Sequence, residues 1–95
     1  MSDFPDLDPI IHAPARLHIV ALLSQLEEAD FTYLLHATGL TRGNLSTHLS
    51  KLEQAAYVEI EKTYRGKRPL TLVRLTEAGR RAFEQYRQAM RAFLG

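Results

Sequence analysis

Short polar side chains recur within residues 41–54 and could form hydrogen bonds to nucleic-acid bases. An asparagine amide can make paired bonds to adenine, a hydroxyl can bond a base or a phosphate, and an arginine can bond guanine or the backbone. The lysine of this stretch would bind phosphate, and the histidine would contact phosphate or pack against the following hairpin. The candidate residues are Arg42, Asn44, Ser46, Thr47, His48, Ser50 and Lys51.

A second candidate group is cationic and lies within residues 64–69. Arg65, Lys67 and Arg68 surround Gly66, which permits a tight turn, and Pro69 stiffens the exit from that turn. A hairpin tip with these positive charges would fit a minor groove of DNA or the flanking phosphates. Either group alone could be an ordinary solvated surface, but the two at this separation favour binding to double-stranded DNA.

Three helices are predicted before the hairpin. Apolar residues at helical spacing indicate a first helix that runs to about Glu27, after Pro14 bends or restarts it. Asp30 is expected to cap a short second helix that ends at Gly39, and Thr41 to cap a third helix through about residue 55. A short helix, a glycine-containing turn and another helix are typical of a helix-turn-helix, here at about 30–55. The third helix has the apolar stripe Leu45, Leu49 and Leu52.

Alternating apolar residues predict two strands of a hairpin over about residues 57–75, with its turn at Tyr64 to Pro69. Thr76 is expected to cap a last helix over about 76–94. This helix has an apolar stripe longer than a three-helix core can easily cover, which favours a homodimer over folding back onto its own first helix. The predicted dimer residues are Phe83, Tyr86, Met90, Phe93 and Leu94.

Composition limits the other possibilities. The 95 residues, 45% of them hydrophobic, are enough for a single domain over 1–95. The net charge is only +1, yet residues 1–30 have six carboxylates against one arginine, whereas residues 41–74 have seven lysines and arginines against three glutamates. A polyanion would be attracted to the middle of the chain. With no apolar run of bilayer length and no signal-peptide pattern at the N-terminus, a cytoplasmic protein is expected.

Catalytic and metal chemistry are not indicated. There is no cysteine, which excludes disulfides and thiolate metal ligands. The four histidines are not paired at helical i, i+4 spacing, so structural or surface roles are expected and no metal or cofactor is predicted. No phosphate-binding glycine loop or nucleophile motif is found, so we expect no enzyme activity. The histidines are His12, His18, His36 and His48.

The sequence resembles the winged helix DNA-binding domains of MarR-like and ArsR-like bacterial transcriptional regulators. The residues that carry the resemblance are the stretches 41–53 and 57–58, the wing at 66–69 and the stretch 75–80, and the likeness extends from residue 11 to the last helix. It implies a mainly α fold with a small β-hairpin, a recognition helix at 41–54, a wing at 64–69 and a homodimer formed through the first and last helices. It also implies a roughly palindromic operator.

The sequence departs from the family at two points. Ala56 stands where such regulators usually have the glycine that ends the recognition helix, so the helix exit is expected to differ. The cysteine ligands of many ArsR-like metal sensors are absent. A small-molecule effector is compatible with the family, but no residue cluster points to one.

Two functions other than binding to double-stranded DNA are compatible with the sequence. A protein-interaction module is the main alternative, because winged helices also serve as docking surfaces and the acidic first thirty residues could attract a partner. Binding to RNA or single strands is less favoured, because apart from Tyr64 the surface aromatics needed for base stacking are missing.

Overall fold

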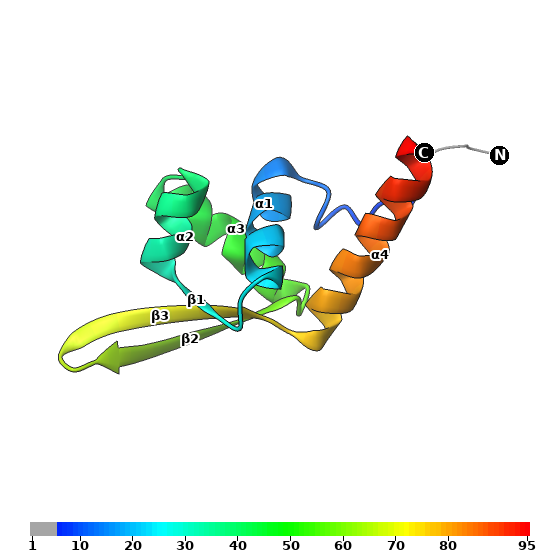
Figure 1. Ribbon diagram of the computed structural model, residues 1–95. Coiled ribbons are helices and arrows are strands. Elements are labelled where there is room, and N and C mark those ends of the chain that lie inside the picture. The colour runs from blue at the N-terminus through cyan, green and yellow to red at the C-terminus, as the bar shows by residue number, and fades with distance from the viewer. Residues whose placement is uncertain (1–5) are drawn as a thin grey trace.

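The computed structural model describes residues 6–95. The first five residues, on which the expectation of no signal peptide partly rests, lie outside the described residues. Helices α1 to α3 lie on one side of an antiparallel sheet, and α4 leans away from them at the end opposite the hairpin tip (Figure 1). The predicted fold, mainly α with a β-hairpin, is confirmed. The elements are α1 (Pro14–Ser24), β1 (Ala29–Asp30), α2 (Phe31–Thr38), α3 (Arg42–Gln54), β2 (Val58–Arg65), β3 (Arg68–Leu75) and α4 (Glu77–Leu94).

The core lies between helices α1 to α3 and the base of the sheet. The predicted stripe of α3 is buried there, and so are apolar residues from α1, α2 and the two long strands. Burial of these side chains supplies most of the free energy of folding, because no disulfide is present. The main core residues are Ile19, Val20, Leu23, Leu34, Leu45, Leu49, Leu52, Val58 and Val73.

The sheet has three strands in the order β1-β3-β2, one more than predicted. The additional strand, β1, is only two residues long and pairs Ala29 with Val73 and Asp30 with Leu72. Asp30 also accepts a hydrogen bond from the Tyr33 backbone N–H, as the predicted cap of α2. A strand this short has no periodicity, so the sequence did not reveal it.

Helix α1 is shorter at its end than predicted, because it stops at Ser24 and not at Glu27. The chain must turn there so that β1 can reach β3. The Arg80 guanidinium of α4 donates to the carbonyl oxygens of Ser24 (3.4 Å) and Leu26 (3.2 Å). The bond to Ser24 satisfies a carbonyl group that the end of α1 leaves unpaired, and the bond to Leu26 holds the turn that follows.

The hairpin turn is tighter than predicted. Strands β2 and β3 pair along their whole length, from Val58 with Leu75 to Arg65 with Arg68, so Tyr64 and Pro69 are strand residues and not part of the turn. Only Gly66 and Lys67 remain in the loop, and Gly66 has a φ of 63°. The wing is therefore a regular two-stranded arm that ends in a two-residue turn.

The exit of α3 does not differ from the family pattern, contrary to the expectation based on Ala56. Ala56 adopts a φ of 64°, the left-handed conformation that favours glycine. Its N–H donates to the carbonyl of Glu53 (2.9 Å), and the Tyr57 N–H donates to the carbonyl of Leu52 (2.9 Å). These two bonds form a Schellman motif. Alanine here costs about 1 kcal/mol, which the rest of the fold offsets.

The start of α4 is packed against this exit. The Thr76 N–H donates to the Tyr57 carbonyl (3.0 Å), and the Thr76 hydroxyl donates to the Ala56 carbonyl (2.7 Å). A Cβ placed on Gly79 would lie 2.2 Å from the Tyr57 carbonyl oxygen. Gly79 is therefore required by the close approach of two backbones.

Substitutions at these two small residues should change stability in opposite directions. A56G removes a left-handed alanine and is expected to raise the free energy of unfolding by about 0.5–1 kcal/mol. G79A should lower it by about 2–3 kcal/mol, because the added methyl group collides with a backbone carbonyl. Urea unfolding of both variants beside the wild type measures this, and equal stability of all three proteins would contradict the described corner.

Candidate nucleic-acid interface

The polar face of α3, defined as Arg42, Asn44, Ser46, Thr47, Ser50 and Lys51, is exposed along its whole length. Thr41 caps the helix by accepting a hydrogen bond from the Asn44 N–H (3.1 Å), as predicted. Leu45 and Leu49 are buried on the opposite side and fix the rotation of the helix. The face has no carboxylate, so its donors and acceptors are presented to solvent without a repulsive charge among them.

Thr47 is partly committed to its own helix. Its hydroxyl donates to the Gly43 carbonyl (2.9 Å), so the oxygen can only accept a further hydrogen bond. The amino groups of adenine and cytosine are donors of the kind such an oxygen accepts. Arg42 lies at the other edge of the face, with its guanidinium 5.9 Å from the ring centroid of Phe31. This cation–π contact directs the arginine toward α2 and the wing.

A groove of about 640 Å³ separates α3 from the wing. On the helix side it is lined by Arg42, Ser46 and Ser50, and on the wing side by Lys62 and Thr71, above apolar groups. Glu53 also lines the groove, and it is the one acidic residue among those that line it. A second, shallower hollow lies on the outer side of α3. Ser46 and Ser50 line both this hollow and the groove, so the two adjoin.

Lys62 was missed as a candidate residue by the sequence analysis. It lies in β2 between Glu61 and Thr63, and these neighbours in the sequence do not indicate that it faces α3. The register pairs it with Thr71, on the same face of the hairpin as Ile60 and Val73, which places it toward α3. Only strand register could have identified it, through the two-residue period of a strand.

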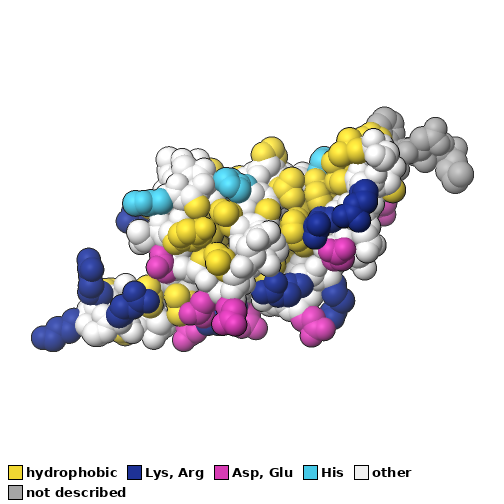
Figure 2. All heavy atoms as spheres, viewed as in Figure 1, with side chains coloured by type: hydrophobic (Ala, Val, Ile, Leu, Met, Phe, Trp, Pro, Cys, Tyr) yellow, Lys and Arg dark blue, Asp and Glu magenta, His cyan; other side chains and the backbone are white. Residues whose placement is uncertain are grey.

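The tip of the wing is strongly cationic. Arg65, Lys67 and Arg68 are all exposed, and within residues 6–95 no carboxylate lies at ion-pair distance from any of them. Figure 2 shows lysine and arginine side chains gathered at this end of the molecule and acidic side chains below the helices. The tip therefore offers three charges that are free to bind phosphate.

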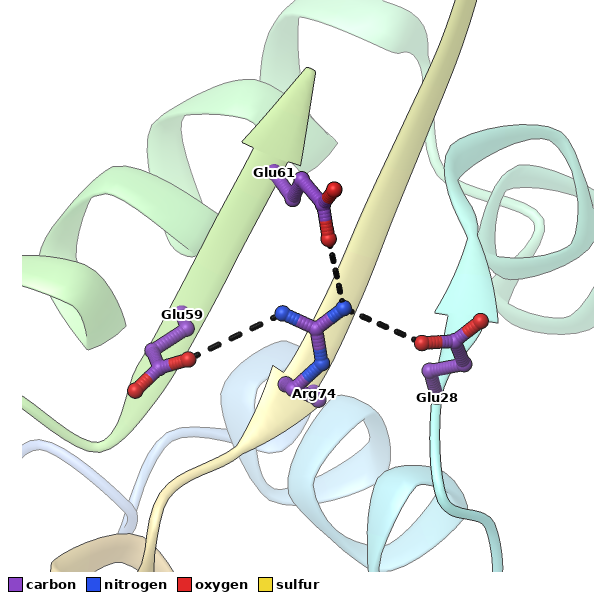
Figure 3. A network of polar contacts seen from close by, with 4 residues as sticks. All are labelled: Glu28, Glu59, Glu61 and Arg74. Atoms are coloured by element: carbon purple, nitrogen blue, oxygen red, sulfur yellow. Dashed lines mark hydrogen bonds and ion pairs between the residues drawn. The ribbon is translucent and has the colours of Figure 1, made fainter. Parts of the chain in front are cut away.

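The acidic side chains gather around Arg74 at the base of the sheet (Figure 3). Its guanidinium lies 2.7 Å from Glu61, 3.0 Å from Glu28 and 3.7 Å from Glu59, and these contacts raise the pKa of Arg74 further above its usual value. Strand register places Glu59, Glu61 and Arg74 on the sheet face opposite Ile60 and the core. Glu59 and Glu61 are therefore on the other side of the sheet from the groove.

His48 is half-buried on the side of α3 that faces α1, and not on its outermost side. Its Nδ1 lies 3.2 Å from the Arg16 guanidinium, which also donates to the Ile10 carbonyl (2.6 Å). Because arginine can only donate, Nδ1 must accept, and the proton of neutral His48 is on Nε2. Burial, followed by the charges of Arg16 and Lys51, lowers the pKa of His48 below its usual 6.5.

The predicted dimer residues fall into two groups. Tyr86 is 6% exposed and its hydroxyl lies 2.7 Å from Nδ1 of His12, while Phe83 packs partly against the core. Further along α4, Phe93 is 48% and Leu94 is 72% exposed. Tyr86 and Phe83 are thus used within the chain, whereas Met90 is partly exposed and Leu94 is mostly exposed.

Among residues 6–95, no three histidine, aspartate or glutamate side chains come close enough to hold a metal ion. The helices of residues 6–95 also lack a stretch with the length and hydropathy of a transmembrane span.

Comparison with known proteins agrees with this geometry. A family model described as a winged helix DNA-binding domain matches residues 15–94. An uncharacterized protein of Methanocaldococcus jannaschii is 42% identical over 77 residues, which are 81% of this chain and 84% of that protein. The chain belongs to the winged helix DNA-binding domain family, as the sequence resemblance predicted.

Solved structures place it among transcriptional regulators. A transcriptional regulator homologue from Pyrococcus horikoshii OT3 superimposes with a TM-score of 0.85 at 29% identity, over 90% of this chain and 84% of that one. A MarR family regulator from Silicibacter pomeroyi gives 0.70 at 25% identity, over 87% of this chain and 55% of that one. The family and the fold are those of transcriptional regulators and not of enzymes.

The contact between His48 and Arg16 predicts a pH dependence of stability. Folded His48 has a pKa below that of the unfolded chain, so below pH 6.5 unfolding takes up a proton and the free energy of unfolding falls. We expect H48N, which keeps an acceptor near Arg16 but does not titrate, to lose less stability than the wild type between pH 7.5 and 5. Urea unfolding at several pH values measures this difference.

The matched control is H18N, a substitution at an exposed histidine of α1. Parallel pH profiles for the wild type and H48N would show that His48 is not the group responsible.

Proposed function

We propose that this protein is a homodimeric transcriptional regulator that binds specific sequences of double-stranded DNA. The observation that carries the proposal is the pairing of an acid-free, exposed polar face on α3 with unpaired cations at the tip of the adjoining wing. The face provides the hydrogen-bonding groups that base edges in the major groove require. The wing provides charge for phosphates or a neighbouring minor groove.

The groove between α3 and the wing fits this arrangement. When a helix occupies the major groove and a wing reaches the minor groove, the sugar-phosphate strand that separates the two grooves passes between them. Lys62 would bind its phosphates from the wing side of the groove. The carboxylate of Glu53 would repel phosphates, so the DNA strand would pass along the outer edge of the groove and would not insert more deeply.

Residue roles follow from these positions. Asn44, Ser46, Thr47 and Ser50 contact bases, with Arg42 at the edge of the base-contacting set. Lys51 and the cations Arg65, Lys67 and Arg68 bind phosphate. His48 can donate from Nε2 to a phosphate oxygen while Arg16 holds Nδ1.

Dimerisation is proposed through the exposed end of α4. Phe93 and Leu94 add apolar surface beyond the part of the helix that Tyr86 and Phe83 anchor within the chain. In the face shown in Figure 2, hydrophobic side chains cover much of the region between α1 and α4. A two-fold pair formed there would present two copies of α3 to successive half-sites of a palindrome.

Salt dependence tests the DNA proposal directly. A duplex selected by the protein from a random pool should bind with an affinity that falls steeply as salt rises. R65A/R68A should weaken binding to all duplexes and reduce the slope of log K against log salt by about 2 per protomer. N44A should instead change the preference at one base step. Fluorescence anisotropy titrations at several salt concentrations measure each effect.

The matched control is R81A/R91A, which removes two exposed arginines from α4 and should change the slope less. If the wing variant binds like the wild type, the wing assignment is wrong. If no duplex binds and a protein partner is retained through the same surfaces, the protein-interaction module is the correct function.

The dimer is tested by L94D, which places a charge at a position 72% exposed in the single chain and so should not disturb its fold. Analytical ultracentrifugation should show a shift from dimer to monomer. Q88D, on the polar side of α4, is the control and should remain dimeric. A wild type that is monomeric at micromolar concentration would contradict this part of the proposal.

A further inference from the structure

Gly43 occupies the first turn of α3, where glycine is unfavourable. Apart from proline, glycine is the residue that least favours a helix, because it loses the most backbone freedom on folding. Its backbone is helical, so no left-handed φ requires it. Beyond its chain neighbours and the backbone of its own helical turns, a Cβ built on Gly43 would have no atom within 4 Å. Neither conformation nor packing within the chain accounts for this glycine.

The other internal glycines each have a structural reason. Gly39 and Gly66 have φ values of 70° and 63°, which side chains rarely adopt. Gly79 lies against the Tyr57 carbonyl, where a Cβ would collide. Among the glycines within helices, Gly43 is thus the one that could be replaced without strain and with a gain in stability.

The position of Gly43 on the helix suggests what the missing side chain provides. At about 100° per residue, Gly43 lies in line with Thr47, Ser50 and Gln54, directly opposite the buried leucines. The Thr47 hydroxyl bonds the Gly43 carbonyl, which keeps that side chain close to the helix surface. The outer surface of α3 therefore protrudes least at its N-terminal end, where Gly43 has no side chain.

Recognition helices insert their N-terminal residues most deeply against base edges. We propose that Gly43 is a specificity-determining residue, whose missing side chain lets the floor of the major groove come into contact with the helix backbone beside Thr47. The inference rests on the proposed DNA-binding function. It adds that the first turn of α3 discriminates between sequences by shape as well as by hydrogen bonds.

The test compares stability and DNA affinity in the same variants. G43A is expected to raise Tm by about 2–4 °C, because alanine restricts the unfolded chain and fits the helix. It should nevertheless weaken binding to the wild-type-selected duplex about tenfold, and G43L about a hundredfold. Binding to a random duplex at low salt, which depends on phosphate contacts, should change less than threefold.

A56G serves as the control for added stability, because it raises stability without adding atoms to α3. It should bind the selected duplex as the wild type does. If G43A lowers Tm, the glycine has a structural role and the inference is overturned. If G43A and G43L bind as tightly as the wild type, Gly43 does not limit the approach of DNA. Failure of the wild type itself to bind any duplex would overturn the proposed function, and this inference with it.

Discussion

The geometry of the proposed interface depends on the corner at Ala56 and Tyr57, where α3 ends and the wing begins. The backbone of this corner is bound on both sides, by the Schellman bonds to α3 and by the Thr76 bonds to the start of α4. Gly79 lets α4 approach closely enough for those bonds to form. The directions of α3, the wing and α4 are thus set together by the hydrogen bonds at this corner.

The segment before α1, together with Arg16 in the first turn of α1, adds a second set of restraints, one of them at this corner. The Tyr57 hydroxyl donates to the Asp8 carboxylate, which, with burial, raises the pKa of Tyr57 to about 12. Arg16 joins the Ile10 carbonyl to His48 on α3, and His12 contacts Tyr86 on α4. The N-terminal segment therefore links the recognition helix to the helix proposed for dimerisation, and a change in the dimer contact could alter the setting of α3 through it.

Much of the fold could be predicted from local patterns. Asp30, Thr41 and Thr76 cap helices as their side-chain chemistry indicated, and the leucine stripe of α3 is buried. Features that depend on pairing over long distances were missed: strand β1, the early end of α1 under Arg80, and the orientation of Lys62. The expectation about Ala56 was wrong for a related reason. A local penalty of about 1 kcal/mol is small compared with the tertiary contacts that hold the corner.

Charge placement explains how a chain with a net charge of only +1 can offer a cationic interface. A strand rises about 3.3 Å per residue, so Glu61 and Arg65 on β2 lie about 13 Å apart. The Debye length at physiological salt is about 8 Å, and the tip therefore acts largely independently of the acidic base. Arg74 also neutralises part of the charge of the three glutamates around it. At 0.01 M salt the Debye length grows to about 30 Å, and the same glutamates would offset the attraction of the tip for phosphate. The separation of charge along the wing thus matters most at the ionic strength of the cell.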